Sequence, residues 1–174
     1  GIFIGLMVYV FIQTFYFKYT QTLIYLLAGL ISILMITFVG FLDDLIIKKS
    51  KESSSGLKQW QKPLLTLSAA VPLMVVNAGV KTMALPFLGR IDVGLVYPLI
   101  FIPIGLVGAA NMINMLAGFN GIETGMGIVY TGMLGLYAFL NGREVGALIA
   151  LLAFTSLIAF YLYNRYPAKI LPGD

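Results

Sequence analysis

Hydrophobic positions along this chain fall into long blocks, separated by short polar segments. Six blocks are mostly apolar and contain no Asp, Glu, Lys or Arg. A membrane-spanning helix needs about 20 mostly apolar residues, and blocks of this kind predict such helices. The expected fold class is therefore all-α, a polytopic bundle of transmembrane helices. The six expected spans are residues 1–17, 22–42, 63–78, 95–110, 125–140 and 146–163.

Composition supports a membrane protein and narrows its chemistry. The chain is 60% hydrophobic and 10% charged, whereas soluble domains carry about 25% charged residues. Cysteine and histidine are both absent, which excludes disulfides, thiolate metal sites and a histidine base. Carboxylates, amides, lysines and arginines remain, and these groups suit Mg²⁺ and phosphate. The net charge of +4 needs no nucleic acid to explain it, since lysines beside membrane spans are ordinary.

Prolines and glycines inside the spans predict local geometry rather than chemistry. Three prolines in the third and fourth spans should kink their helices: Pro72, Pro98 and Pro103. Four glycines in the fifth span should let a neighbouring helix approach closely: Gly125, Gly127, Gly132 and Gly135.

The polar segments would alternate between the two faces of the membrane. With six spans, segments 43–62, 111–124 and 164–174 share one face, which carries seven of the eleven Lys and Arg residues. The positive-inside rule places that face in the cytoplasm. Five of the seven acidic residues lie there too, so the unusual polar segments gather where nucleotide sugars are found.

Asp43 and Asp44 stand together at the end of the second span. A charged stop at the membrane edge is the simpler interpretation, but that role usually falls to Lys or Arg, which are long enough to reach water. Two adjacent carboxylates at a low-dielectric boundary repel each other and are stabilised by a cation. The pair therefore favours a functional role.

An asparagine-rich segment, 111–125, interrupts an otherwise apolar stretch. Asn111 and Asn114 are three residues apart and would share one face of a helix. Turns at Gly118 and Gly121 would bring Asn120 and Glu123 back toward them. Asparagine can recognise a base or ribose, and its oxygen can bind Mg²⁺. Hydrogen bonding between helices is the structural alternative.

Two further features lie on the same expected face. Lys62 directly precedes Pro63 at the start of a span, where a fixed lysine could meet a phosphate. The segment 164–174 is basic and ends in Gly173 and Asp174. Together these groups suit phosphoryl transfer, which needs oxygen ligands for a metal, cations for phosphate charge and polar groups for a nucleotide.

These motifs resemble the polyprenyl-phosphate N-acetylhexosamine-1-phosphate transferase family, and most closely its dolichyl-phosphate N-acetylglucosamine-phosphotransferase branch. The resemblance runs in order through residues 40–44, 62–66, 111–123 and 163–174. Ala117, Gly118 and Asn120 favour the dolichyl-type branch, because bacterial relatives resemble Asn-x-x-Asn-x-x-Asp-Gly-x-Asp-Gly at this place. Leu171 departs from the family, in which many relatives have Phe there.

The resemblance implies a role for each motif. Asn114 and Asp174 resemble Mg²⁺ ligands, with Mn²⁺ as an alternative ion. Asp43 and Asp44 resemble the acidic pair beside the reacting phosphates, and Lys62 the lysine that meets the pyrophosphate. Asn120 and Glu123 resemble contacts to the nucleoside. Asn111 resembles a neighbour that supports the metal or pyrophosphate site.

The implied reaction is attack of a polyprenyl phosphate on the β-phosphate of UDP-N-acetylglucosamine, giving a polyprenyl diphosphate sugar and UMP. In this family it is the first step of lipid-linked oligosaccharide assembly for N-glycosylation. The expected location is the cell membrane in an archaeon or the endoplasmic reticulum membrane in a eukaryote. The chain starts at Gly1, not Met, and we expect residues 1–174 to be a single-domain fragment of a protein of about ten spans. The first span and the later spans with their basic loop would lie outside it.

Three alternatives remain open at this level. A bacterial-type transferase would keep the chemistry and use undecaprenyl phosphate. An ion-coupled transporter would place ionisable groups near the membrane midplane, whereas every acid here lies at a span end. A purely structural membrane subunit would leave the acidic pair and the asparagines unexplained. The sequence does not distinguish a homodimer from a monomer.

Overall fold

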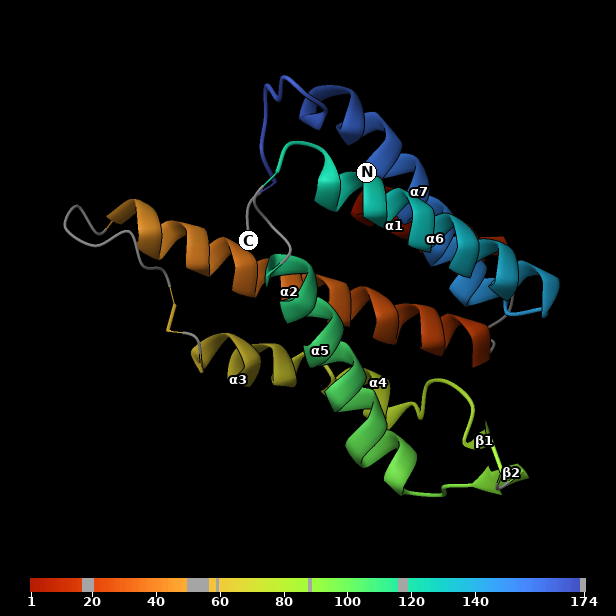
Figure 1. Cartoon of the computed structure of the whole chain (residues 1–174). Helices are drawn as coiled ribbons and strands as arrows, with labels where there is room; N and C mark the ends of the chain where they lie inside the picture. Colours follow the sequence, from red (N-terminus) through yellow and green to blue (C-terminus); the bar gives the residue numbers. More distant parts are fainter. Residues whose placement is uncertain (17–20, 50–56, 59, 88, 116–118, 173–174) are drawn as a thin grey trace. The chain divides into compact units, whose positions relative to one another are not determined.

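Helices make up most of the chain in a computed structural model (Figure 1). The structure describes residues 1–16, 21–49, 57–58, 60–87, 89–115 and 119–172. The α-helices are α1 (Ile2–Tyr16), α2 (Gln21–Lys49), α3 (Gln61–Ser68), α4 (Val71–Val75), α5 (Ile102–Met115), α6 (Ile122–Leu140) and α7 (Glu144–Asn164). A π-helical turn, η1 (Tyr97–Phe101), precedes α5, and two short strands are β1 (Thr82–Leu85) and β2 (Gly89–Asp92). The helical fold class is confirmed.

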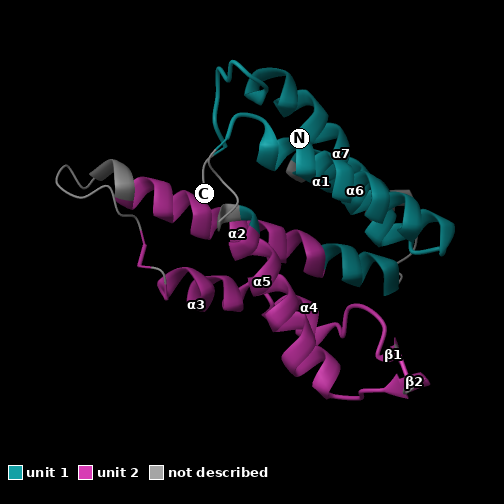
Figure 2. Cartoon of the chain, in the orientation of Figure 1, with its two compact units in different colours: residues 1–27, 113–173 teal, residues 28–112, 174 magenta. Residues whose placement is uncertain are grey.

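The chain divides into two compact units (Figure 2). Unit 1 contains residues 1–27 and 113–173, and unit 2 contains residues 28–112 and 174. Helices α1, α6 and α7 belong to unit 1, whereas α3, α4 and the strand pair belong to unit 2. The single membrane domain expected for residues 1–174 stays a prediction.

Two of the described helices are long and apolar enough to cross a membrane. They are residues 21–46 of α2 and the whole of α7, and a shorter apolar helix covers Tyr97–Ile113. Large apolar side chains such as Phe38, Leu134 and Phe139 are exposed, which suits contact with lipid. The length and composition of these helices suit a membrane protein. Each of the six expected spans overlaps at least one described helix, but the count of six stays a prediction.

Helices α6 and α7 form the most closely packed pair and run antiparallel. Three glycines of α6 face α7 so closely that an added Cβ atom would lie 3.0–3.1 Å from a side chain: Gly127 from Leu157, Gly132 from Phe154 and Gly135 from Ala150. Gly125 has more room, at 3.8 Å from Tyr161. The expected close contact through these glycines is confirmed at three of the four positions.

The expected continuous helix over residues 63–78 is wrong, and a proline explains the break. Helices α3 and α4 meet at Ala69 and Ala70, whose N–H groups bond three residues back, at 3.1 and 3.0 Å. Pro72 has no N–H to offer the carbonyl of Ser68, so the ladder is interrupted there. Pro98 likewise lies in the π-helical turn η1, where the spacing of bonds is altered.

A small β-hairpin is the exception to the helical fold. Strands β1 and β2 pair antiparallel, with Thr82 opposite Asp92 and Leu85 opposite Gly89. The hairpin lies between the third and fourth expected spans. Strands of four residues carry too little alternation to predict, and only the turn residues Pro86 and Gly89 hint at the hairpin.

Candidate active site

A buried ion pair joins α2 to the start of α3 in unit 2. Asp43 is only 1% exposed, and its Oδ2 lies 2.7 Å from the Nζ of Lys62. The backbone N–H of Leu57 donates a hydrogen bond to Oδ1 of the same carboxylate. Oδ2 accepts no well-aligned hydrogen bond from the described residues, so its contact with Lys62 is a close pairing of charges. A buried carboxylate is stable only with such partners.

The neighbouring Asp44 has a different environment. It is exposed, whereas Asp43 is buried. Successive residues of an α-helix project about 100° apart, so the two carboxylates leave α2 in different directions. Helix α2 continues beyond the pair to Lys49, so the acids do not end the helix as its sequence suggested. The structure thus separates the pair into one carboxylate held by a lysine and one open to a ligand.

Asn111 of α5 belongs to the same polar group through Thr66. Its Nδ2 donates to Oγ1 of Thr66 at 3.3 Å and to the carbonyl of Val107 at 2.8 Å. The buried hydroxyl of Thr66 lies 3.0 Å from the carbonyl of Lys62, to which it can donate. Asp43, Lys62 and Asn111 are therefore brought together in unit 2. Thr66 was not predicted, although its spacing of four from Lys62 on one helix face was the available signal.

In unit 1, Asn120 and Glu123 surround the start of α6. Asn120 is exposed in a turn, and Glu123 is half-buried in the first helical turn, where the helix dipole favours an acid. Gly121 caps the helix with φ +83°, a conformation that suits glycine. The expected turn is confirmed at Gly121, whereas Gly118 lies outside the described residues.

A neutral hydrogen-bond network ties this turn to the segment after α7. The hydroxyl of Thr124 donates to Oδ1 of Asn164 at 2.6 Å, and Nδ2 of Asn164 donates to the carbonyl of Ile170 at 3.0 Å. Thr124 and Asn164 are both buried, at 3% and 1% exposure. The segment that leads toward Asp174 is thereby attached to α6. Asn164 was not among the predicted site residues.

The expected metal pair lies at the limits of the described structure. Asn114 belongs to α5, but its side chain is outside the described residues, as is Asp174. Within the described part, no group of three or more acidic side chains could hold a metal ion. Mg²⁺ often binds one or two carboxylates, with waters and substrate phosphates completing its shell. The exposed carboxylate of Asp44 fits that kind of hard, oxygen-bound cation.

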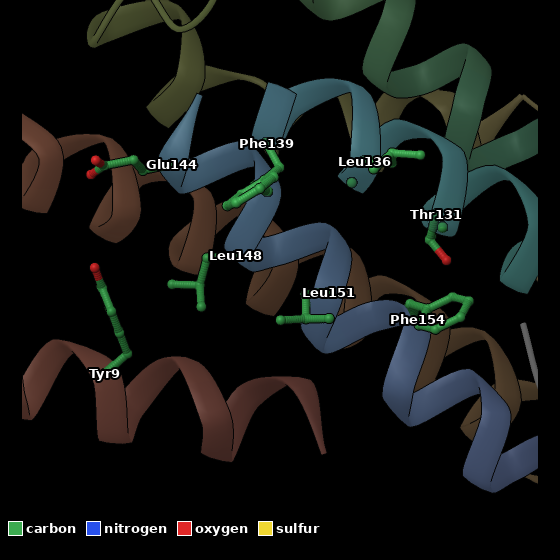
Figure 3. A pocket seen from close by; sticks show the side chains of 11 residues that line it. Tyr9, Thr131, Leu136, Phe139, Glu144, Leu148, Leu151 and Phe154 are labelled. Carbon is green, nitrogen blue, oxygen red and sulfur yellow. The ribbon is translucent and has the colours of Figure 1, made fainter. Parts of the chain in front are cut away.

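A separate cavity of about 590 Å³ lies among α1, α6 and α7 in unit 1 (Figure 3). Tyr9 and Glu144 mark one end of it, and Thr131 and Phe154 mark the other (Figure 3). Its walls are mostly aliphatic and aromatic, and no lysine or arginine among the described residues lines it. The predicted site residues whose side chains the structure describes do not line it either. A nucleoside diphosphate needs cations for its phosphates, and the described lining offers none.

Comparisons with known proteins bear on this geometry. A relative from Saccharolobus solfataricus is 40% identical over 152 residues, which is 84% of this chain and 44% of the relative. Its provisional name is UDP-N-acetylglucosamine–dolichyl-phosphate N-acetylglucosaminephosphotransferase. A relative from Sulfolobus acidocaldarius carries the same provisional name and is 31% identical over 147 residues, 83% of this chain and 42% of its own.

A bacterial relative broadens the comparison. The phospho-N-acetylmuramoyl-pentapeptide-transferase of Lactobacillus helveticus is 35% identical over 155 residues, 83% of this chain and 45% of its own. The chain spans less than half the length of these three relatives. Residues 26–174, which include every predicted site residue, match the family profile described as glycosyl transferase family 4. The chain therefore belongs to glycosyl transferase family 4.

Proposed function

We propose that this chain forms part of an enzyme that transfers N-acetylglucosamine-1-phosphate from UDP-N-acetylglucosamine to a dolichyl-type polyprenyl phosphate. The products would be polyprenyl diphosphate–N-acetylglucosamine and UMP, as the first step of lipid-linked oligosaccharide assembly. The observation that carries the proposal is the pairing of Lys62 with buried Asp43 beside exposed Asp44. The names of the archaeal relatives support this choice of substrates.

The ion pair suits Lys62 to meet the pyrophosphate of the nucleotide sugar. Asp43 and the first turn of α3 hold the lysine in place, and its side chain remains 25% exposed. A preorganised cation stabilises the negative charge that builds up during phosphoryl transfer, and it does so most strongly where water is scarce. Asp43 in this account positions the lysine and does not touch the substrate.

The reaction balances without a general base. An oxygen of the lipid phosphate bonds to the β-phosphorus of the nucleotide sugar, while the bond from that phosphorus to the bridging oxygen breaks. UMP leaves with the electron pair. A phosphate monoester has a second pKa of about 6, so the attacking group is already mostly a dianion near neutral pH. Asp44 is then free to orient a cation or the lipid headgroup and need not remove a proton.

A bound Mg²⁺ would neutralise phosphate charge, and Asn114 and Asp174 are its proposed ligands, with Asp44 proposed to lie beside the reacting phosphates. Asn111 would hold α3 through its bond to Thr66 and support the metal or pyrophosphate site. Asn120 and Glu123 would contact the nucleoside. All these groups are proposed to face the cytoplasm in a multi-pass protein of the cell membrane or the endoplasmic reticulum.

The test uses the full-length protein that contains this chain, in nanodiscs with Mg²⁺ and polyprenyl phosphate. Radiolabelled UDP-N-acetylglucosamine and labelled UDP-N-acetylmuramoyl-pentapeptide are supplied in parallel, and label extracted into organic solvent is counted. Label from the first donor that disappears with EDTA supports the proposal. Label from the pentapeptide donor alone would assign the activity of the bacterial relative instead. No lipid label from either donor, with folded protein, would contradict a transferase.

A further inference from the structure

We propose that Asn164 and Thr124 are positioning residues that hold the segment before Asp174 against the turn containing Asn120. This inference rests on the proposed function, because it concerns how that site is assembled. The starting observation is the burial of Asn164, which is 1% exposed at the last position of α7. A buried amide is costly unless its donor and acceptor are both satisfied.

Each end of the Asn164 amide bonds to a different segment. Oδ1 accepts a hydrogen bond from the hydroxyl of Thr124, in the first turn of α6, at 2.6 Å. Nδ2 donates to the carbonyl of Ile170 at 3.0 Å, in the segment beyond α7. One side chain thus links α6, the end of α7 and the following loop. Water alone could satisfy the backbone groups at the end of α7. The specific linkage through Asn164 therefore indicates that the loop after α7 is held in a fixed position.

Backbone contacts reinforce the same arrangement. The N–H of Lys169 donates to the carbonyl of Tyr163 at 2.8 Å, which folds the loop back onto the end of α7. A Cβ atom added to Gly121 would lie 3.4 Å from the Cα of Arg165 and 3.2 Å from the ring of Tyr161. The turn after Asn120 therefore packs directly against the start of the loop.

The consequence is a fixed position for one proposed binding element. Asn120 and Glu123 lie within four residues of Thr124. Loss of the bond between Thr124 and Asn164 would let the loop after α7 shift against the turn that carries these nucleoside contacts. The lipid phosphate would be less affected, because Asp44 and Lys62 belong to unit 2, whereas Thr124 and Asn164 belong to unit 1. Binding of the nucleotide sugar should therefore weaken selectively.

The test compares two isosteric substitutions in the same helix of the full-length protein. Thr124→Val removes the hydroxyl that reaches Asn164. Thr131→Val is the matched control, since Thr131 is also buried but donates to Gly127 of its own helix at 2.6 Å. Thr124→Ser restores the hydroxyl and should rescue the first variant. The assay measures KM for UDP-N-acetylglucosamine and KM for polyprenyl phosphate.

We expect Thr124→Val to raise KM for UDP-N-acetylglucosamine about tenfold, which corresponds to about 1.4 kcal/mol. KM for polyprenyl phosphate should stay within about twofold, and Thr131→Val and Thr124→Ser should resemble the wild type. Equal effects of the two valine variants, an equal rise in both KM values, or no rescue by serine would overturn the inference. A wild type without transferase activity would instead contradict the proposed function itself.

Discussion

The polar groups of the two units are built on different physical principles. In unit 2, the carboxylate of Asp43 is buried and pairs with Lys62, whose side chain is 25% exposed. In unit 1, Thr124 and Asn164 form a neutral, fully buried network that presents no charge. Charged pairs supply electrostatic stabilisation to a reacting phosphate, whereas neutral networks set the geometry of the segments around it. We infer that the ion pair of unit 2 serves the chemistry and the neutral network of unit 1 serves positioning.

Breaking the charge pair should have the largest effect. Lys62→Met leaves the carboxylate of Asp43 buried without its cation, and the free energy of unfolding should fall by about 3 kcal/mol. Transferase activity should fall on the order of 10³-fold, because the proposed pyrophosphate cation is lost as well. Thermal unfolding in detergent and the lipid-label assay measure the two effects. Lys58→Met, which removes an exposed lysine from the preceding segment, is the control.

The double variant Asp43→Asn with Lys62→Met separates the two effects. It removes both charges, so most of the lost stability should return while the activity stays low. A double variant no more stable than Lys62→Met alone would show that the ion pair does not stabilise the junction between α2 and α3.

Asp44 should affect activity and leave stability unchanged. Asp44→Asn changes an exposed carboxylate that needs no buried partner, so the unfolding midpoint should move little. Activity should fall on the order of 10²-fold if the carboxylate orients the cation or lipid headgroup. Steady-state assays beside thermal unfolding measure this. An equal loss of activity and stability would remove the distinction between the two adjacent acids.

Replacing a glycine by alanine should lower stability in the closely packed pair α6 and α7 of unit 1, but not in α5. Gly135→Ala places a Cβ 3.1 Å from that of Ala150, so α6 and α7 must separate slightly and about 1 kcal/mol of stability should be lost. Gly105→Ala meets nothing within 4 Å and should stabilise α5 by about 0.5–1 kcal/mol. Chemical unfolding of both variants provides the comparison. Changes of the same sign would contradict it.

The smallest effect should come from the long hydrogen bond in unit 2. Thr66→Val removes the oxygen that Asn111 reaches at 3.3 Å, a distance at the weak end for such bonds. Activity should fall by no more than about threefold, less than for Thr124→Val. A larger loss would mean that neutral positioning is as important in unit 2 as in unit 1.

Sequence patterns predicted the helical class and the close glycines of α6. These features follow from residue type and helical spacing. The expectation that the segments with Asp43, Lys62 and Asn111 share one face of the membrane stays a prediction. The distinct environments of Asp43 and Asp44 could not be predicted, because burial depends on which face of α2 meets α3. The bond between Thr124 and Asn164 joins residues 40 apart, and no local pattern reports such a contact. The hairpin was not predicted, because its four-residue strands are too short to show an alternating hydrophobic pattern.

In the proposed reaction, the β-phosphate moves to the lipid together with the sugar. The deciding experiment supplies the full-length protein with polyprenyl phosphate, Mg²⁺ and UDP-N-acetylglucosamine labelled with ³²P at the β-phosphate and ³H in the sugar. Both labels should appear in the lipid product in equal molar amounts, with UMP formed in the same quantity in water. Sugar label in the lipid without ³²P, accompanied by UDP, would indicate simple glycosyl transfer and contradict the proposed reaction.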